Sequence, residues 1–142
     1  MMLPAGCGGS APKPAPKPAP DPGALVTQAL YSYLRAQSQG DGATACALLT
    51  ASGQNELAAV VVKKGDGLIT SSPSCLDAVG LVHTFAGAKL LHALATARVE
   101  QVRVSGSSAT AEVVDGTAFR PEQVRLVKSG AAWKIDAVPG LG

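Results

Sequence analysis

The spacing of apolar residues changes near residue 96, and this change limits the fold more than any other feature of the sequence. Before it, apolar side chains recur at helical spacing, as in residues 25–34. From residue 97 they alternate with polar ones, as in the stretch Ala109-Thr-Ala-Glu-Val113. Helices followed by alternating strands predict an α+β domain, with N-terminal helices packed on a curved antiparallel sheet of about four strands.

The helical part divides at residues that typically begin or end helices. Asp21 is predicted to cap a first helix that starts at Pro22, and Gly40 to end it. Asp41 is predicted to cap a short second helix that carries Cys46.

Three further helices are predicted before residue 96. One opens at Ser52 and ends near Lys64, although the β-branched run Val60–Val62 also permits a strand. The others are a segment that begins at Ser72-Pro73 and is interrupted at Gly80 or Gly87, and a segment over residues 89–95.

The alternating part predicts an antiparallel meander. A slip of one residue near Glu100-Gln101 indicates a β-bulge. Turns are expected at Ser105-Gly106 and Ser129-Gly130, with a loop over residues 115–121. The positions predicted to face the helices are Val102, Val104, Ala109, Ala111, Val113, Trp133 and Ile135.

The N-terminal stretch predicts how the protein is held. Residues Leu3-Pro-Ala-Gly-Cys7 resemble the box that ends bacterial lipoprotein signal peptides, whose Cys receives the lipid. The six residues before Cys7 are too few for an export signal, so we interpret residues 1–22 as a truncated lipoprotein signal with its lipobox and a Pro-rich tether. This predicts an exported lipoprotein on the extracytoplasmic face of the cell-envelope membrane. The alternative is an incidental cysteine in an unstructured tail.

The tether itself has a characteristic sequence. Residues 11–22 read APKPAPKPAPDP, and proline at every second position favours polyproline II. At ~3.1 Å per residue it would separate the domain from its anchor by about 35 Å. The alternative interpretation is that residues 11–22 are a ligand for a proline-recognising domain. The folded domain is predicted to span residues 23–142.

Two cysteines remain for the domain. In an exported protein, Cys46 and Cys75 form an even pair in an oxidising compartment, which favours a structural disulfide. A metal site or a catalytic thiol are the alternatives. A metal site would require more ligands than the two histidines, His83 and His92, provide.

Charge and aromatic content argue against some classes of partner. The net charge is +2, no Lys/Arg cluster is dense enough to follow a phosphate backbone, and aromatic residues make up 4%. Nucleic acid is therefore not a predicted partner. No run of 18 apolar residues occurs, so no membrane-spanning helix is predicted.

Two regions resemble a known superfamily. They are YSYLRAQSQGDGATACALLTASGQNELA (31–58) and the C-terminal stretches VEQVRVSGSSATAEV and VRLVKSGAAWKID. Together they resemble the NTF2-like superfamily, in particular small actinobacterial envelope lipoproteins of unknown function. The resemblance implies that the sheet wraps the first helix around a cone-shaped cavity. By analogy it also implies a homodimer through the open sheet face.

The expected function follows from this cone. We expect a non-catalytic domain that binds a small apolar ligand or an envelope protein, with no catalytic residue, cofactor or metal. The alternative is a SnoaL-like or isomerase-like enzyme, which would need an inward acid or base such as Glu100 or His83. A folded spacer without a site is a third interpretation. The residues predicted to line the cavity are Tyr33, Val102, Val104, Val113, Trp133 and Ile135.

Overall fold

The computed structural model describes residues 20–114 and 122–138, and these form an α+β domain. Five helices precede a four-stranded antiparallel sheet in this part of the chain, as predicted. The helices are α1 (Pro22–Gln39), α2 (Gly42–Ala47), α3 (Ala51–Lys64), α4 (Cys75–Phe85) and α5 (Ala88–Thr96). The strands are β1 (Arg98–Ser105), β2 (Ser108–Val114), β3 (Glu122–Ser129) and β4 (Ala132–Ala137).

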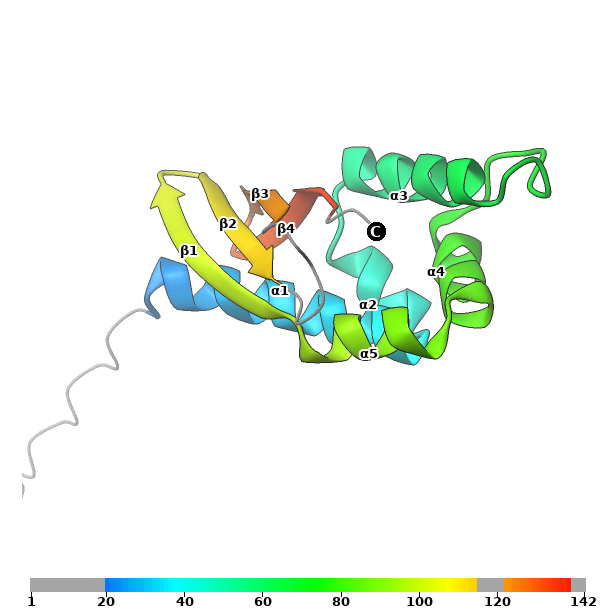
Figure 1. The fold of residues 1–142 in the computed structure, drawn as a ribbon. Helices are drawn as coiled ribbons and strands as arrows, with labels where there is room; N and C mark the ends of the chain where they lie inside the picture. The colour runs from blue at the N-terminus through cyan, green and yellow to red at the C-terminus, as the bar shows by residue number, and fades with distance from the viewer. Residues whose placement is uncertain (1–19, 115–121, 139–142) are drawn as a thin grey trace, which may run out of the picture.

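The first helix links the two halves of the domain. Its start lies beside the sheet, and its end lies among the other helices, which gather at the opposite side in Figure 1. Pro22 occupies the first turn, and Asp21 stands at the N-cap position without a side-chain capping bond. Gly40 ends the helix in the left-handed conformation, with φ 72°. A Cβ on Gly40 would also lie 2.7 Å from the His83 ring, so this turn requires glycine for two reasons.

The sheet is a simple meander in the order β1-β2-β3-β4. The register of β1 on β2 shifts between Glu100 and Arg103, and Gln101 has φ 53°. The bulge predicted near Glu100-Gln101 is confirmed. It moves Val102 and Val104 onto the helix-facing side, because Val104 then pairs with the buried Ala109.

The main core lies between α1 and the sheet and continues among the helices. Helix α1 contributes one buried stripe along its length, and the sheet contributes alternate residues of β2, β3 and β4. The fully buried large side chains include Leu30, Tyr33, Leu34, Leu49, Leu57, Leu126 and Ile135.

Two predicted helix starts are wrong in detail, whereas the predicted interruption falls at one of the two glycines expected for it. Helix α3 is capped by Thr50 and not by Ser52, because the Thr50 backbone N–H is bonded to the Ile135 carbonyl and fixes the chain there. Helix α4 begins after Ser74, whose hydroxyl accepts from the Asp77 amide, and not at Ser72-Pro73. It also continues through Gly80, since Val79 and Val82 keep one face buried on both sides of this glycine. The interruption falls at Gly87.

The valine run in α3 is helical and not a strand. Leu57, Ala58 and Val61 are buried on one face at a spacing of three and four residues, which only a helix brings together. Burial of that face outweighs the weak preference of consecutive valines for a strand.

Candidate functional site

An apolar groove lies between the end of α3 and the helices α4 and α5. Its volume is about 640 Å³, which falls within the range of small-molecule sites. The last turn of α3 and the following loop form one wall, and the second half of α4 with the start of α5 forms the other. The lining residues are Val61, Lys64, Gly65, Asp66, Leu68, Ile69, Leu81, Val82, Phe85, Ala86, Gly87 and Leu90.

Local capping and one covalent bond position these helices. Thr50 caps α3 and Ser74 caps α4, each through a hydroxyl oxygen that accepts a hydrogen bond from a backbone amide. The disulfide Cys46–Cys75 joins α2 to the first residue of α4, so the predicted pairing is confirmed. The bond anchors the start of α4, while the groove lies at its other end. The disulfide therefore fixes the position of α4 without occupying the groove.

The groove offers little chemistry beyond apolar contact. Its ionisable side chains are Lys64 and Asp66, and the rest of the lining is aliphatic, aromatic or glycine. This lining suits an apolar molecule, with one cation and one anion at the edge for a polar group. Sequence reasoning missed this groove. A signal was present in the run of apolar residues through α4 and α5, which contains more large side chains than two short helices can bury on one face.

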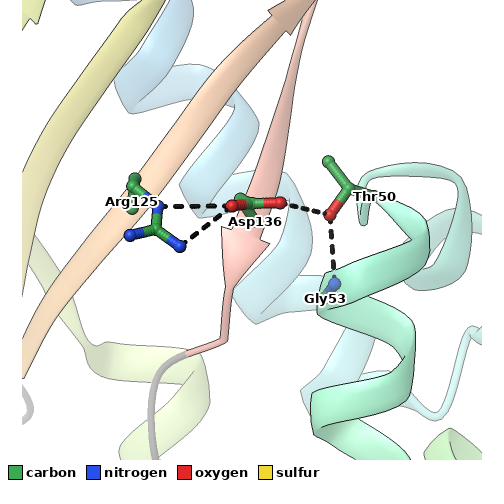
Figure 2. Close-up of polar contacts among 4 residues, drawn as sticks. All are labelled: Thr50, Gly53, Arg125 and Asp136. Atoms are coloured by element: carbon green, nitrogen blue, oxygen red, sulfur yellow. Dashed lines mark hydrogen bonds and ion pairs between the residues drawn. The ribbon is translucent and has the colours of Figure 1, made fainter.

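A polar cluster joins α3 to the sheet (Figure 2). One carboxylate oxygen of Asp136 accepts from the Thr50 hydroxyl at 2.8 Å. The other accepts from Nε and Nη2 of Arg125 at 3.2 and 3.0 Å. The same Thr50 hydroxyl oxygen accepts from the Gly53 amide at 3.0 Å. Both carboxylate oxygens of Asp136 thus have a protein partner, and the cluster fixes the first turn of α3 against β4.

Backbone contacts beside this cluster are equally close. Ile135 donates to the Leu48 carbonyl at 2.7 Å and accepts from Thr50 at 3.0 Å. A Cβ on Gly53 would lie 2.6 Å from the Ile135 carbonyl oxygen. We interpret the cluster as structural, because its geometry brings a helix and a strand into backbone contact and leaves no space for a ligand there.

A buried polar pair lies on α1. The Gln37 side-chain N–H donates to the Tyr33 hydroxyl at 2.8 Å, and among the described residues Gln37 Oε1 has no partner. Desolvation raises the pKa of Tyr33 to about 12, which outweighs the lowering by the Gln37 hydrogen bond. The phenol therefore stays neutral near pH 7 and cannot act as a base there.

The residues predicted to line the cone have different environments. Tyr33, Val113, Trp133 and Ile135 belong to the buried core, and Val102 packs partly buried against it. Val104 is 36% exposed, although it faces the same side. Gly23, in the first turn of α1, lies next to Val102, so Val104 extends beyond the part of β1 that the helix covers. That these six residues line a ligand cavity stays a prediction.

The residues considered for acid–base chemistry lie at the surface. Glu100 is exposed and pairs with Arg98 at 3.6 Å. His83 and His92 are exposed, with the His83 ring against the Gly40 turn. Neither Glu100 nor His83 lies between α1 and the sheet, where the enzyme alternative would require one of them. Cys7 lies outside the described residues.

Metal ligands and membrane-spanning helices are the remaining features to consider among the described residues. Across residues 20–114 and 122–138, no group of three or more His, Cys, Asp or Glu side chains could hold a metal ion. In the same residues no single helix is long and apolar enough to cross a membrane. Helices α4 and α5 together meet that length and composition, but the pair is bent by 116°.

The comparisons with known proteins add no relative. The sequence matches no protein-family model, and searches of curated proteins and of solved structures found no match.

Proposed function

We propose that this chain is an exported lipoprotein whose NTF2-like domain binds a small apolar ligand without catalysing a reaction. A lipid on Cys7 would anchor it to the extracytoplasmic face of the cell-envelope membrane. The observation that carries the proposal is the groove of about 640 Å³ between α3, α4 and α5, because its lining is almost wholly apolar.

The fold assignment is supported by the relation of α1 to the sheet. A long first helix packs on one face of a bulged antiparallel sheet, and this face carries the largest buried side chains. A first helix against one face of the sheet is also what the sequence resemblance implies. In this chain, however, the core side chains fill the space between helix and sheet, and the open apolar volume lies further along, among α3, α4 and α5.

The anchor is supported by three features. Small residues flank Cys7, a proline-rich segment follows it, and the domain contains the disulfide Cys46–Cys75. A structural disulfide is typical of exported proteins. An intact mass of the protein, expressed in a bacterium from the longest in-frame start, tests this part. We expect a diacylglyceryl-sized addition at Cys7 and a gain of two hydrogens on reduction. An unlipidated chain would contradict the anchor.

Ligand binding is tested with a solvatochromic alkyl probe titrated into the purified full chain. We expect saturable binding with a blue-shifted emission. Gly87 lines the groove, and a Cβ there meets nothing within 4 Å, so Gly87→Tyr places a ring over the groove without displacing the core. This variant should weaken probe binding about tenfold or more.

Gly80 provides the matched control for this variant. It lies in α4, outside the groove, and a Cβ there also meets nothing within 4 Å. Gly80→Tyr should bind the probe as the wild type does. Equal loss in both variants, or no saturable binding at all, would contradict the groove as a ligand site.

A further inference from the structure

Two large apolar side chains protrude at the edge of the groove. Leu68 in the loop after α3 is 90% exposed, and Phe85 at the end of α4 is 77% exposed. They are the most exposed large hydrophobic side chains among the described residues, and both line the groove. We call them the Leu68–Phe85 rim. Large apolar side chains exposed on both walls of one groove are typical of a surface that meets an apolar partner.

Three lysines lie on the helices that form the groove, and one of them, Lys64, also lines it. Lys63 and Lys64 lie in the last turn of α3, five and four residues before Leu68, and Lys89 lies in the first turn of α5. All three are exposed, and the ion pairs of the described residues involve none of them. The loop itself carries one carboxylate, Asp66. Protruding Leu and Phe side chains next to an excess of Lys are the composition of a surface that lies on anionic lipid.

The position of the tether is compatible with such a contact. In Figure 1 the start of α1, where the tether joins, lies at the opposite end of the domain from α4. An 18-residue helix is about 27 Å long, whereas the tether predicted from the sequence extends about 35 Å. A tether of the length predicted from the sequence would let the domain lie alongside the membrane, with the far end at the bilayer surface.

We propose that the Leu68–Phe85 rim docks on the surface of an anionic lipid bilayer. Both side chains enter the interfacial region, and Lys63, Lys64 and Lys89 face the lipid headgroups. The docked groove then opens toward the acyl chains, so an apolar ligand passes between membrane and groove without crossing water. The inference rests on the proposed apolar-ligand function of the same groove and adds where the ligand enters.

The experiment uses the full chain with Cys7→Ser, so that no lipid anchor contributes. It is sedimented with vesicles of phosphatidylcholine and phosphatidylglycerol in a 3:1 ratio, and with pure phosphatidylcholine vesicles. We expect binding to the anionic vesicles that weakens at high salt. Leu68→Ser and Phe85→Ser should each lower the partition coefficient about tenfold, because each removes one inserting side chain.

Leu76 supplies the matched control. It is a 58% exposed leucine of α4 that packs against Gly42, away from the groove. Leu76→Ser should leave vesicle binding within about twofold of the wild type. An equal loss of vesicle binding in Leu76→Ser and Phe85→Ser would overturn the proposal, because any exposed apolar residue would then contribute to binding, wherever it lies.

The alkyl probe, measured without vesicles, separates this inference from the function on which it rests. A chain that binds the probe but neither kind of vesicle overturns membrane docking and leaves the rim to a protein partner, with the ligand site intact. A chain that binds vesicles through the rim but not the probe retains docking and contradicts the ligand site. Vesicle binding that is independent of phosphatidylglycerol would contradict the part assigned to the lysines.

Discussion

The half of the domain made by α1 and the sheet buries most of its large apolar side chains, whereas the corner made by α3, α4 and α5 leaves its most exposed ones in water. Trp133, Leu126 and Ile135 are enclosed against α1, but Leu68 and Phe85 protrude. The two halves also differ in their links. The sheet is held by backbone hydrogen bonds between its strands, and the corner by helix caps and a disulfide. The comparison indicates that the first half supplies stability and the second an open apolar surface.

The largest expected effect comes from exchanging one aromatic residue in each half. Trp133→Ala removes the largest core side chain and should lower the free energy of unfolding by about 3–5 kcal/mol. Phe85→Ala should change it by less than about 0.5 kcal/mol, because that ring is already in water. Urea unfolding followed by circular dichroism measures both. Similar losses of unfolding free energy in the two variants would show that the two halves do not differ in their contribution to stability.

The disulfide should contribute nearly as much as the core tryptophan. It closes a separation of 29 residues, for which the chain-entropy model gives about 3–4 kcal/mol. The double variant Cys46→Ala/Cys75→Ala should therefore be less stable by this amount in the same denaturation experiment. Hydrogen exchange should locate the gain in mobility in α2 and α4. A uniform loss over the sheet would show that the bond does not act on the corner alone.

Alkaline pH should weaken the α1–sheet half through Tyr33. The pKa of Tyr33 is about 12 in the folded protein, against an ordinary 10.0. The folded protein therefore keeps a proton that the unfolded chain releases between pH 10 and 12. Stability is complete below pH 10 and falls by about 2–3 kcal/mol as the pH rises to 12. In Tyr33→Phe, the slope of unfolding free energy against pH over this window should be smaller. An unchanged slope would assign the alkaline loss to other groups.

The smallest changes in stability are expected from replacing two helical glycines, and the two changes should have opposite signs. Gly53→Ala places a Cβ 2.6 Å from the Ile135 carbonyl oxygen, which should cost about 1–3 kcal/mol because backbone cannot yield easily. Gly80→Ala places its Cβ in open space and should stabilise α4 by about 0.5–1 kcal/mol. Thermal unfolding of both variants measures the two signs. The same sign in both would contradict the close approach of α3 to β4.

Much of the fold could be predicted from local pattern. The order of elements, the bulge near Gln101 and the end of α1 at Gly40 depend on spacing and on residues with a strong backbone preference. The disulfide was also predictable, because Cys46 and Cys75 form an even pair once export is assumed. These features need little knowledge of which segments meet in space.

The errors arose where distant segments decide a local outcome. Thr50 caps α3 because β4, more than eighty residues later, bonds to its backbone and side chain. The groove likewise forms between α3, α4 and α5. The spacing of apolar residues along the sequence does not indicate whether another segment buries Phe85 or Leu68. The alternation of apolar and polar residues places Arg125 and Asp136 on separate strands and does not indicate that they pair and join the sheet to α3. Long-range contacts of this kind leave little signal in one sequence.

The most direct test of the account is hydrogen–deuterium exchange of the full chain with and without the alkyl probe. If the ligand binds in the groove, bound probe should slow exchange at the end of α3, in the loop that contains Leu68, and in α4 and α5, while exchange in α1 and β1–β4 stays unchanged. Protection confined instead to α1 and the helix-facing strands around Val113 and Trp133 would contradict it, and would place the ligand in the cone between α1 and the sheet.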